Sequence, residues 1–499
     1  MKSFLLSIIL ICLTSIVGFS QVTNMKVVNK LGDQAPDSSL IAALNQPSIN
    51  SRGEVAYLGT DGKEIRLFIT RNVFSNPTTE ILAKRGTPIP GLSGLDLLKI
   101  TFPKINDRGD VLFSGTLSQN LFGGLFIASD GQINKVIVDG TKTPIGGVFV
   151  DLALSSLFTF NNNGEVTLVS SVADGSSDVG IFTIKNDQIN KVVANGDILA
   201  DGTKLKISLQ TVPAINDQGD VLFSAATELE PNKPAIYLFS QGQVKKVVGS
   251  GDTTVDGEKL DMVLSSGRYL NDRREILFSG KIGSSDGIYL YSAETNKITK
   301  LVANGDSAPD GGTFRGLSIS LTPAHGALIN NNRFVFRGGT TKTIYGLFYF
   351  KDGKIIKIVG HREPTPLGGV FADNATFNCA MLGAILTEKD QVVFETTITG
   401  GSSPKALIAW SENALTAPTI NSANYDKKAK SLTIKALGVN SSIQVEINAK
   451  LITQPIKLIS DSELSLKGNK KKLNLNKAAN TNRLVLITTD GLRSDAFVF

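Results

Sequence analysis

Carboxylates recur at one place in the sequence, in loops that begin with Gly-Asp. Four of these loops read GDQAPD (32–37), GDILADG (196–202), GDTTVDG (251–257) and GDSAPDGG (305–312). If the loops emerge on one face, their side chains form an acidic ring. The ring is interrupted, because the matching loops at Gly86 and Gly140 lack the Asp. The ring would contain Asp33, Asp37, Asp197, Asp201, Asp252, Asp256, Asp306 and Asp310.

Oxygen-rich loops of this kind can hold Ca²⁺ or bind sugar hydroxyl groups. Paired carboxylates can also act as acid and base in polysaccharide cleavage. The plainer interpretation is that an Asp before Gly shapes the turn, and the sequence favours it because the Asp recurs with the repeat. No DxDxDG spacing supports calcium. We therefore expect no cofactor, with Ca²⁺ as the alternative, and take as candidate binding residues Asp33, Asp197, Asp252, Asp306, Asp310 and His361.

Other reactive side chains are scarce. The chain has two histidines, His325 and His361, and one tryptophan, Trp410. His361 follows Gly360 and is interpreted as filling the Asp position of a seventh loop, whereas His325 lies in a small insertion. They have no HExxH-like spacing, and no Ser/His/Asp set can be read from the chain. Cys379, in FNCAML, is interpreted as a buried structural thiol. We predict no catalytic residue.

The segments that must position these loops repeat about every 55 residues. INDRGDVLFSG (105–115) returns almost unchanged as INDQGDVLFS (215–224). The Asn of this phrase or its equivalent occurs at seven positions, namely Asn50, Asn106, Asn161, Asn216, Asn271, Asn330 and Thr387. A second marker also has seven copies, at Gly32, Gly86, Gly140, Gly196, Gly251, Gly305 and Gly360. Two independent markers with the same period indicate seven structural units.

Each unit contains four short apolar runs separated by turn residues, which is the pattern of antiparallel hairpins. In the second unit the expected strands are 97–105, 110–117, 123–129 and 133–138. The NxxG phrase between the first two predicts an Asx turn closed by a glycine with positive φ. The structural turn residues are Asn50, Gly53, Asn106, Gly109, Asn161, Gly164, Asn216 and Gly219. Arg274 and Asp390 occupy the Gly position in two units, and we expect Arg274 to distort its turn.

Seven four-stranded units favour a seven-bladed β-propeller over an open solenoid. The last unit stops at its third strand, KALIAWSEN (405–413), and the N-terminal NMKVVNKLGD (24–33) resembles the missing fourth strand. Pairing of 25–31 beside 405–411 would close the ring and remove both sheet edges. The predicted fold is all-β, a propeller closed by the N-terminal strand and followed by a small β-sandwich.

INSRGEVAY (49–57) and its copies resemble the bacterial choice-of-anchor tandem-repeat proteins defined by an NxxGxxAF motif. In this copy Asn50, Gly53, Ala56 and Tyr57 occupy the motif positions. The resemblance covers roughly 25–415 and implies a repeat architecture with no established reaction. Family members typically end in a sorting anchor, and no such C-terminal anchor is recognised here.

The two ends of the chain differ from the repeats. Residues 1–20 are typical of a signal peptide, and no later segment is apolar over the length of a membrane span. The repeats occupy 21–415, and residues 417–499 are expected to form a β-sandwich similar to IPT-type immunoglobulin-like modules. That segment holds 13 Lys and Arg against 6 Asp and Glu, although the whole chain has a net charge of only +6. It suits either attachment to anionic envelope polymers or a solvated surface.

The composition and motifs favour an exported protein without enzymatic activity. We expect a secreted, periplasmic or cell-surface monomer that binds an envelope or extracellular partner, a glycan or a protein. Nucleic acid is excluded as a partner, because the basic residues are not interleaved with aromatic ones. The alternative is a polysaccharide-active hydrolase or lyase that uses the acidic loops.

Overall fold

The computed structural model describes residues 24–499 except 76, 93, 119–122, 153–155, 320–332, 373–380, 388, 413–418, 438–442, 461–462, 477, 479–480 and 488–492. The predicted signal peptide, His325 and Cys379 therefore lie outside the described residues. Chain contacts divide the protein into two units. The repeat unit comprises Val28–Arg362 and Gly369–Leu407, and the C-terminal unit comprises Met1–Val27, Glu363–Gly368 and Ile408–Phe499.

The described repeats form seven antiparallel sheets, numbered here from one to seven along the chain. Sheet one contains β2 (Ala43–Ile49), β3 (Val55–Thr60), β4 (Ile65–Arg71) and β5 (Thr78–Lys84). Sheet two contains β6 (Leu97–Ile105), β7 (Val111–Leu117), β8 (Gly123–Ser129) and β9 (Gln132–Val138). Sheet three contains β10 (Val148–Val150), β11 (Phe158–Phe160), β12 (Val166–Ala173), β13 (Val179–Lys185) and β14 (Gln188–Ala194). Sheet four contains β15 (Leu205–Lys206), β16 (Ala214–Ile215), β17 (Val221–Thr227), β18 (Ala235–Ser240) and β19 (Gln243–Val248). The four strands expected in the second unit agree with β6–β9.

The last three sheets follow the same order. Sheet five contains β20 (Met262–Leu270), β21 (Glu275–Ile282), β22 (Ser285–Ser292) and β23 (Lys297–Ala303). Sheet six contains β24 (Phe314–Ile319), β25 (Arg333–Thr340), β26 (Gly346–Lys351) and β27 (Lys354–Gly360). Sheet seven contains β28 (Val370–Phe371), β29 (Met381–Leu386), β30 (Gln391–Thr399), β31 (Lys405–Ser411) and β1 (Met25–Lys30). In its strand order, β1 stands next to β31. Within the repeat unit, the Leu31 N–H donates to the Lys405 carbonyl at 3.2 Å.

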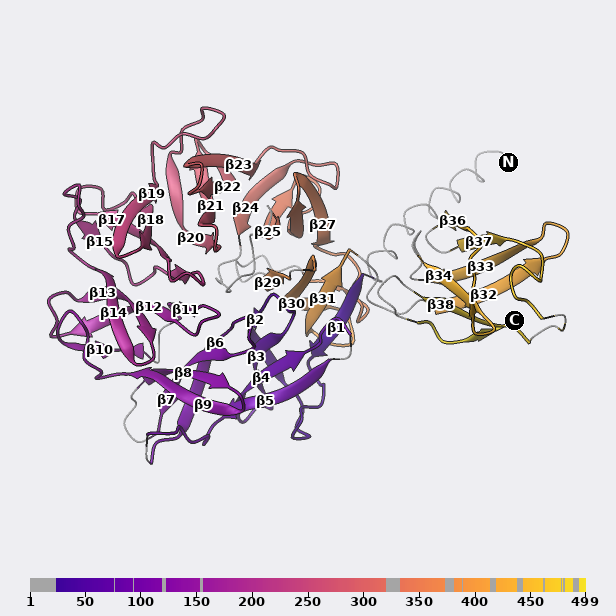
Figure 1. Cartoon of the computed structure of the whole chain (residues 1–499), viewed down its shortest axis with the longest axis horizontal. Coiled ribbons are helices and arrows are strands. Elements are labelled where there is room, and N and C mark those ends of the chain that lie inside the picture. Colours follow the sequence, from indigo (N-terminus) through magenta and orange to yellow (C-terminus); the bar gives the residue numbers. More distant parts are fainter. Residues whose placement is uncertain are drawn as a thin grey trace, which may run out of the picture. The chain divides into compact units, whose positions relative to one another are not determined.

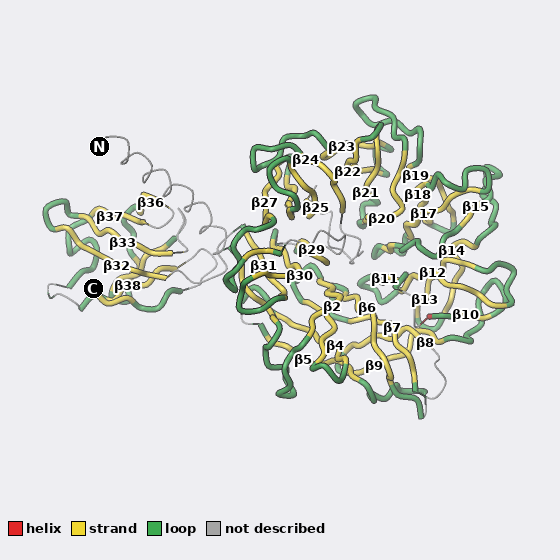
Figure 2. Tube along the Cα trace, turned by 180° about the vertical axis from the view of Figure 1, so that it is seen from behind, coloured by secondary structure: helices red, strands yellow, loops and turns green. Residues whose placement is uncertain are grey.

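Successive sheets of the repeat unit pack on one another around a common centre, with β2, β6, β11, β20 and β29 innermost (Figures 1 and 2). β2 contacts β6, β16 contacts both β11 and β20, and β2 also contacts β29 of sheet seven. Shared cores fill the spaces between sheets one and two, two and three, three and four, and four and five. Since each sheet is packed on two sides, the second strand is buried on both faces, as Val111, Leu112 and Phe113 show. The arrangement is β-propeller-like.

The NxxG phrase forms the expected Asx turn in each described copy that carries it. In sheet two, Asn106 Oδ1 accepts hydrogen bonds from the N–H groups of Arg108 and Asp110 at 3.1 and 3.0 Å. Gly109 has a φ of +89°, which favours glycine. Arg274 takes the glycine position with a φ of +56° and the usual backbone bond, its N–H donating to the Asn271 carbonyl at 3.0 Å. The expectation of a distorted turn at Arg274 was wrong.

Arg274 tolerates this backbone because its side chain has a partner in the preceding sheet. Its Nε donates to the carboxylate of Asp220 at 2.7 Å, and that carboxylate is almost completely buried. Burial alone would raise the pKa of Asp220, but hydrogen bonds from Arg274, Ser240 and Asn216 outweigh burial and lower it. The ion pair therefore offsets the backbone strain of a non-glycine residue in the left-handed region.

The same Asn side chains also join neighbouring sheets, which the sequence did not predict. The Nδ2 of each Asn donates to the backbone carbonyl of the Asn one repeat later. The distances are 2.9 Å for Asn50 to Asn106, 3.3 Å for Asn106 to Asn161, 2.9 Å for Asn161 to Asn216 and 3.2 Å for Asn216 to Asn271. We call this series the Asn ladder. These four donor side chains are almost fully buried, so the bonds are shielded from water and tie five consecutive sheets together.

The seventh loop begins two residues later than predicted. In the other loops the marker glycine donates its N–H to the next sheet, as Gly196 does to Leu205 and Gly305 to Phe314. In the seventh loop Arg362 makes this bond, to Phe371, and has a φ of +63°. His361 therefore precedes the glycine position and does not occupy the Asp position. The repeat is longer here, and spacing alone could not reveal the shift.

The C-terminal unit contains two four-stranded sheets around one apolar core. One sheet has the order β32 (Thr419–Asp426), β33 (Ser431–Leu437), β37 (Glu463–Lys467), β36 (Ile456–Ser460), and the other β35 (Lys450–Leu451), β34 (Gln444–Ile447), β38 (Arg483–Ile487), β39 (Phe497–Val498). Residues 471–474 form turns outside the two sheets. Leu473 is buried in the core, which explains the apolar pattern of that segment.

Candidate functional site

The carboxylates of the Gly-Asp loops are used inside their own turns. Each accepts a hydrogen bond from the backbone N–H three residues earlier, which caps the end of the preceding strand. The bonds run from Lys30 to Asp33 at 2.9 Å, from Ala194 to Asp197 at 2.8 Å, from Gly249 to Asp252 at 2.7 Å and from Ala303 to Asp306 at 2.7 Å. In the loop after β5, Thr87 Oγ1 accepts the corresponding bond from Lys84 at 3.0 Å. The recurrence of Asp therefore has a structural cause.

Further contacts occupy the remaining oxygens of several loop carboxylates. Lys191 Nζ lies 3.1 Å from both carboxylate oxygens of Asp197. Asp310 accepts hydrogen bonds from Thr340, from Thr343 at 2.9 Å and from the Gly312 N–H at 2.9 Å. Burial would raise the pKa of Asp310, but these bonds outweigh it and lower the pKa. Within the described residues no group of three or more His, Cys, Asp or Glu side chains is placed to hold a metal ion.

A cavity of about 690 Å³ lies instead at the innermost strands of the repeat unit. β2 and β6 form most of its wall, Ser156 and Val212 extend it beside sheets three and four, and sheet seven contributes Glu395 and Lys405. Both β2 and β6 are irregular here: their register shifts between Asn45 and Ser48 and between Thr101 and Lys104. Bulges of this kind re-aim side chains and occur next to active sites.

The backbone of this cavity is strained at two equivalent positions. Gln46 and Phe102, which both line the cavity, have φ values of +54° and +53°. Neither residue type favours this region, and such strain gathers at functional sites. The Gln46 side chain accepts a hydrogen bond from the Phe102 N–H at 2.8 Å, which fixes the two strands relative to each other.

Three lysines face the cavity, and they differ in their partners. Lys405 is neutralised, with its Nζ 2.5 Å from Glu395 Oε1 and 3.2 Å from Asn45 Oδ1. Lys99 is exposed, Lys104 keeps only part of its surface in contact with solvent, and among the described residues neither has an ion-pair partner. Burial among protein atoms lowers the pKa of Lys104 to about 8. The described lining of the cavity therefore carries a net positive charge.

Glu395 is the second perturbed group in this cavity. Its side chain is only 6% exposed. Its Oε1 is paired with Lys405, but Oε2 is buried and has no hydrogen-bond partner in the described structure. Burial raises the pKa of Glu395, and the neighbouring Lys405 offsets this only in part. A buried acceptor without a donor is unfavourable unless a ligand or water supplies one.

Sequence reasoning missed Lys104 and Glu395, although the repeat contained a signal for Glu395. In the second strand, the position after the buried aromatic residue (Leu168 in sheet three) is uncharged in five repeats and charged in two. Its residues are Leu58, Ser114, Val169, Ser224, Ser279, Arg337 and Glu395. Arg337 also has buried nitrogen atoms, Nε and Nη1, without a partner among the described residues. Comparing the repeats for residues that break their symmetry would have found both charges.

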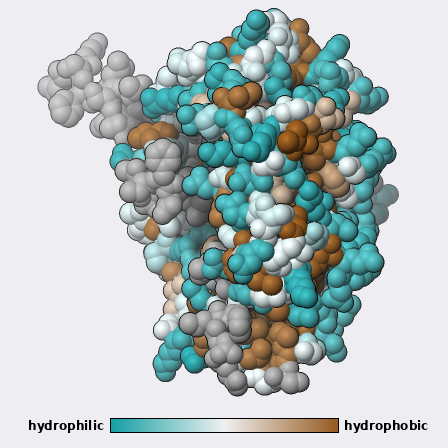
Figure 3. Space-filling model, turned by 90° about the vertical axis from the view of Figure 1, so that its left-hand side faces the viewer, coloured by the Kyte–Doolittle hydropathy of each residue, from teal (hydrophilic) through white to brown (hydrophobic). Residues whose placement is uncertain are grey.

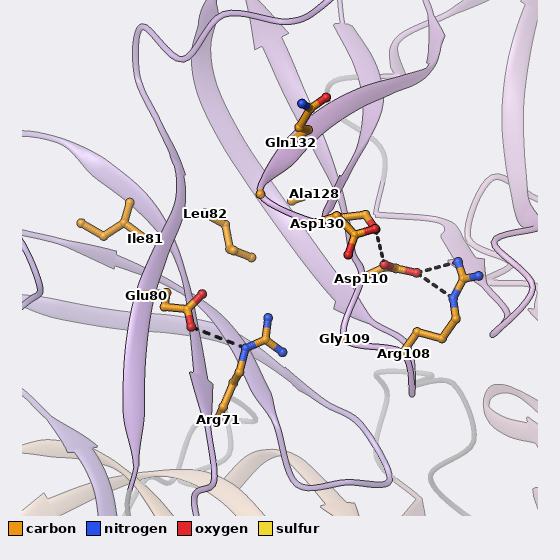
Figure 4. A pocket seen from close by; sticks show the side chains of 12 residues that line it. Arg71, Glu80, Ile81, Leu82, Arg108, Gly109, Asp110, Ala128, Asp130 and Gln132 are labelled. Carbon is orange, nitrogen blue, oxygen red and sulfur yellow. Dashed lines mark hydrogen bonds and ion pairs between the residues drawn. The ribbon is translucent and has the colours of Figure 1, made fainter.

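A second, smaller cavity of about 230 Å³ lies between sheets one and two (Figure 4). Its two guanidinium groups already have partners: Arg71 Nη1 lies 2.6 Å from Glu54 Oε1, and Arg108 Nη2 lies 2.6 Å from Asp110 Oδ2. With its cations neutralised in this way, this cavity is the weaker candidate.

On the side where sheets three and four lie, apolar patches are separated by polar side chains (Figure 3).

The repeat region matches a model described as a family of unknown function, DUF7453, over residues 14–183 and 160–419. The chain belongs to this family. The matched description names no activity, and it does not test the choice-of-anchor resemblance. None of the curated proteins compared with the chain matches it.

Several solved structures resemble the chain weakly. TolB from Acinetobacter baumannii shares 13% identity at a TM-score of 0.28, and the match covers 51% of this chain and 53% of that one. PorZ of the type-IX secretion system of Porphyromonas gingivalis shares 13% at 0.38, covering 91% and 58%. An oligogalacturonate lyase from Vibrio parahaemolyticus shares 9% at 0.41, covering 78% and 97%. The chain thus spans little more than half the length of the first two, and we base no functional argument on these likenesses.

The described residues contain no helix long and apolar enough to cross a membrane.

Proposed function

We propose that the chain is an exported binding protein of the bacterial cell envelope or extracellular space, without enzymatic activity, that takes its ligand in the cavity of the innermost strands. The observation that carries this proposal is the cavity itself. Its lining combines bulged and strained strands, two lysines without an ion-pair partner among the described residues and a buried carboxylate oxygen. Concave sites with a few convergent polar groups and perturbed pKa values are the usual places for ligands. A glycan or a protein segment is the expected partner.

The proposal includes the complete architecture: a seven-bladed propeller closed by β1, followed by an immunoglobulin-like or IPT-like module for attachment or spacing. The position of β1 next to β31 and the contact of β2 with β29 support closure. Closure is tested by removing residues 1–31, with removal of 1–23 as the control. We expect the shorter deletion to be neutral and the longer one to lower Tm and cause association, because it exposes the edge of β31. Unchanged Tm and monomeric behaviour after the longer deletion would contradict closure.

Binding is tested with the full chain on a panel of glycans and purified envelope polymers. Ile65, 39% exposed, lines the cavity, whereas Ile344, 49% exposed, does not. An Ile65→Trp variant should block the cavity, and Ile344→Trp adds the same bulk elsewhere. We expect Ile65→Trp alone to abolish binding. A ligand that binds both variants equally would place the site outside this cavity.

A polysaccharide-active hydrolase or lyase is the second candidate. The loop carboxylates give it no support, because they cap their own turns. What favours it is Lys104, since an amine with a pKa of about 8 can accept a proton near neutral pH. Release of unsaturated or reducing ends from a bound polysaccharide would establish this alternative, and binding without turnover would exclude it for that polymer.

A further inference from the structure

The charges around the cavity are unbalanced in a way that points to the chemistry of its ligand. Lys405 is neutralised by Glu395, so this pair adds no net charge. Lys99 and Lys104 lie on the same strand, β6, and the described residues supply no carboxylate to either. A desolvated ammonium group without a counter-ion is costly, and proteins retain one chiefly where a ligand or a reaction uses it.

The register of β6 places both lysines on the cavity side in spite of the strand's alternation. Lys99 and Lys104 are five residues apart, an odd number, so a regular strand would direct them to opposite faces. The register shift between Thr101 and Lys104 breaks this alternation, and Phe102 takes a φ of +53° at the shift. The strain at Phe102 thus has a consequence: it brings a second lysine to the cavity wall.

A polar acceptor completes the wall. Glu395 Oε2 is buried without a donor, and Glu395 lines the same cavity as the two lysines. A hydroxyl group can donate to this oxygen without adding charge. The apolar surfaces of Ile100, Phe102 and Pro103 lie alongside and suit the carbon face of a small ring or chain.

We infer that the cavity binds a hydroxylated anion, a sugar or polyol that carries a carboxylate or phosphate group. The anionic group pairs with Lys99 and Lys104, and a hydroxyl donates to Glu395 Oε2. This inference rests on the proposed binding function and specifies the class of ligand. Charge-assisted hydrogen bonds from two ammonium groups supply both the affinity and the selectivity against neutral sugars.

The test is calorimetric titration of the full chain with four probes: glucose, gluconate, glucose 6-phosphate and inorganic phosphate. We expect gluconate or glucose 6-phosphate to bind and glucose not to bind. The preferred probe distinguishes a carboxylate from a phosphate ligand. Binding of inorganic phosphate as tight as glucose 6-phosphate would remove the role given to Glu395.

Variants separate the lysines from general charge effects. Lys104→Met and Lys99→Met should each weaken binding roughly tenfold or more, the effect of losing one charged hydrogen bond. Lys185→Met changes an exposed lysine at the end of β13, outside the cavity, and should leave binding unchanged. Binding to wild type should also fall as the pH rises past about 8, because Lys104 then loses its proton.

The outcomes distinguish this inference from the proposal beneath it. If only neutral glycans bind, and Ile65→Trp abolishes that binding, the binding function stands and the anionic ligand is wrong. If anions bind with equal affinity to wild type and Lys104→Met, the lysine site is wrong. If no probe, glycan or envelope polymer binds at all, the proposed function itself fails.

Discussion

The side-chain amide of Asn161 donates a hydrogen bond of 2.9 Å to the backbone carbonyl of Asn216, in the next sheet. The same amide group holds its own turn, since Asn161 Oδ1 accepts from the N–H groups of Asn163 and Glu165 at 3.0 and 2.9 Å. One buried side chain thus satisfies two backbone donors of its own turn and one carbonyl of the neighbouring sheet. The Asn ladder explains why a turn residue is completely buried, which is unusual for a hairpin turn.

Asn161→Ala should lower the free energy of unfolding by about 2–4 kcal/mol, because two N–H groups of the turn lose their acceptor and the carbonyl of Asn216 loses a buried donor. Urea denaturation provides the measurement. Asn134→Ala, at an exposed position of β9, is the control and should change stability by less than about 0.5 kcal/mol.

Asn161→Asp isolates the bond between the sheets. The carboxylate keeps the acceptor for the turn but replaces the amide donor with an oxygen that faces the carbonyl of Asn216. We expect a loss of about 1–3 kcal/mol in the same experiment. An Asp variant as stable as wild type would show that the Asn ladder adds nothing beyond the turn.

Gly109→Ala should destabilise the protein more than Gly131→Ala. Both glycines have positive φ, +89° and +74°, so each variant carries a backbone cost of about 1 kcal/mol. A Cβ at Gly131 meets nothing within 4 Å, whereas one at Gly109 lies 2.9 Å from the guanidinium groups of Arg52 and Arg71. The difference between the two Tm values measures the displacement of these side chains. Equal Tm values would mean that the arginines move away freely.

Lys104→Met should stabilise the protein at pH 7, by about 1–3 kcal/mol. Folding lowers the pKa of Lys104 from 10.5 to about 8, so the unfolded chain binds this proton more tightly than the folded one. The penalty is fully present below pH 8 and disappears as the pH rises toward 10.5. Denaturation should therefore show a clearly larger gain at pH 7 than at pH 10.

The same variant distinguishes a functional lysine from an ordinary one. Lys185→Met is the matched control and should leave stability unchanged at both pH values. A residue whose removal raises stability and weakens ligand binding is retained for function and not for folding. If Lys104→Met instead destabilises the protein at pH 7, the lysine stabilises the fold and the cavity argument loses its main support.

Asp252→Ala should lower the free energy of unfolding by about 1 kcal/mol, because the Gly249 N–H loses its acceptor. Asp256→Ala, in the same loop at an exposed position, should be neutral. Since the Asp252 carboxylate caps a turn, chelator should leave the Tm of wild type unchanged. A fall in Tm upon chelation, absent in Asp252→Ala, would establish a Ca²⁺ site at these loops instead.

The repeat, the strand positions and the turns could be predicted from the sequence, because they depend on residues close together in the chain. An apolar run of three and a glycine with positive φ suffice to predict β7 and the turn before it. The Asn side chains were assigned to those turns correctly. Their burial follows from a hydrogen bond to a carbonyl 55 residues away, as Asn161 makes to Asn216, and no local sequence pattern predicts this bond.

The location of the candidate site could not be predicted from the sequence, because it depends on contacts between distant strands. The recurring Asp residues, conspicuous in the sequence, cap their own turns, and the shift at Arg362 removed His361 from their series. Lys104 is unremarkable in sequence, and Glu395 stands out only when the repeats are compared. The properties of both arise from burial and from shared access to one cavity. The pKa values of both side chains depend on the groups packed around them, and those groups come from strands that lie far apart along the chain.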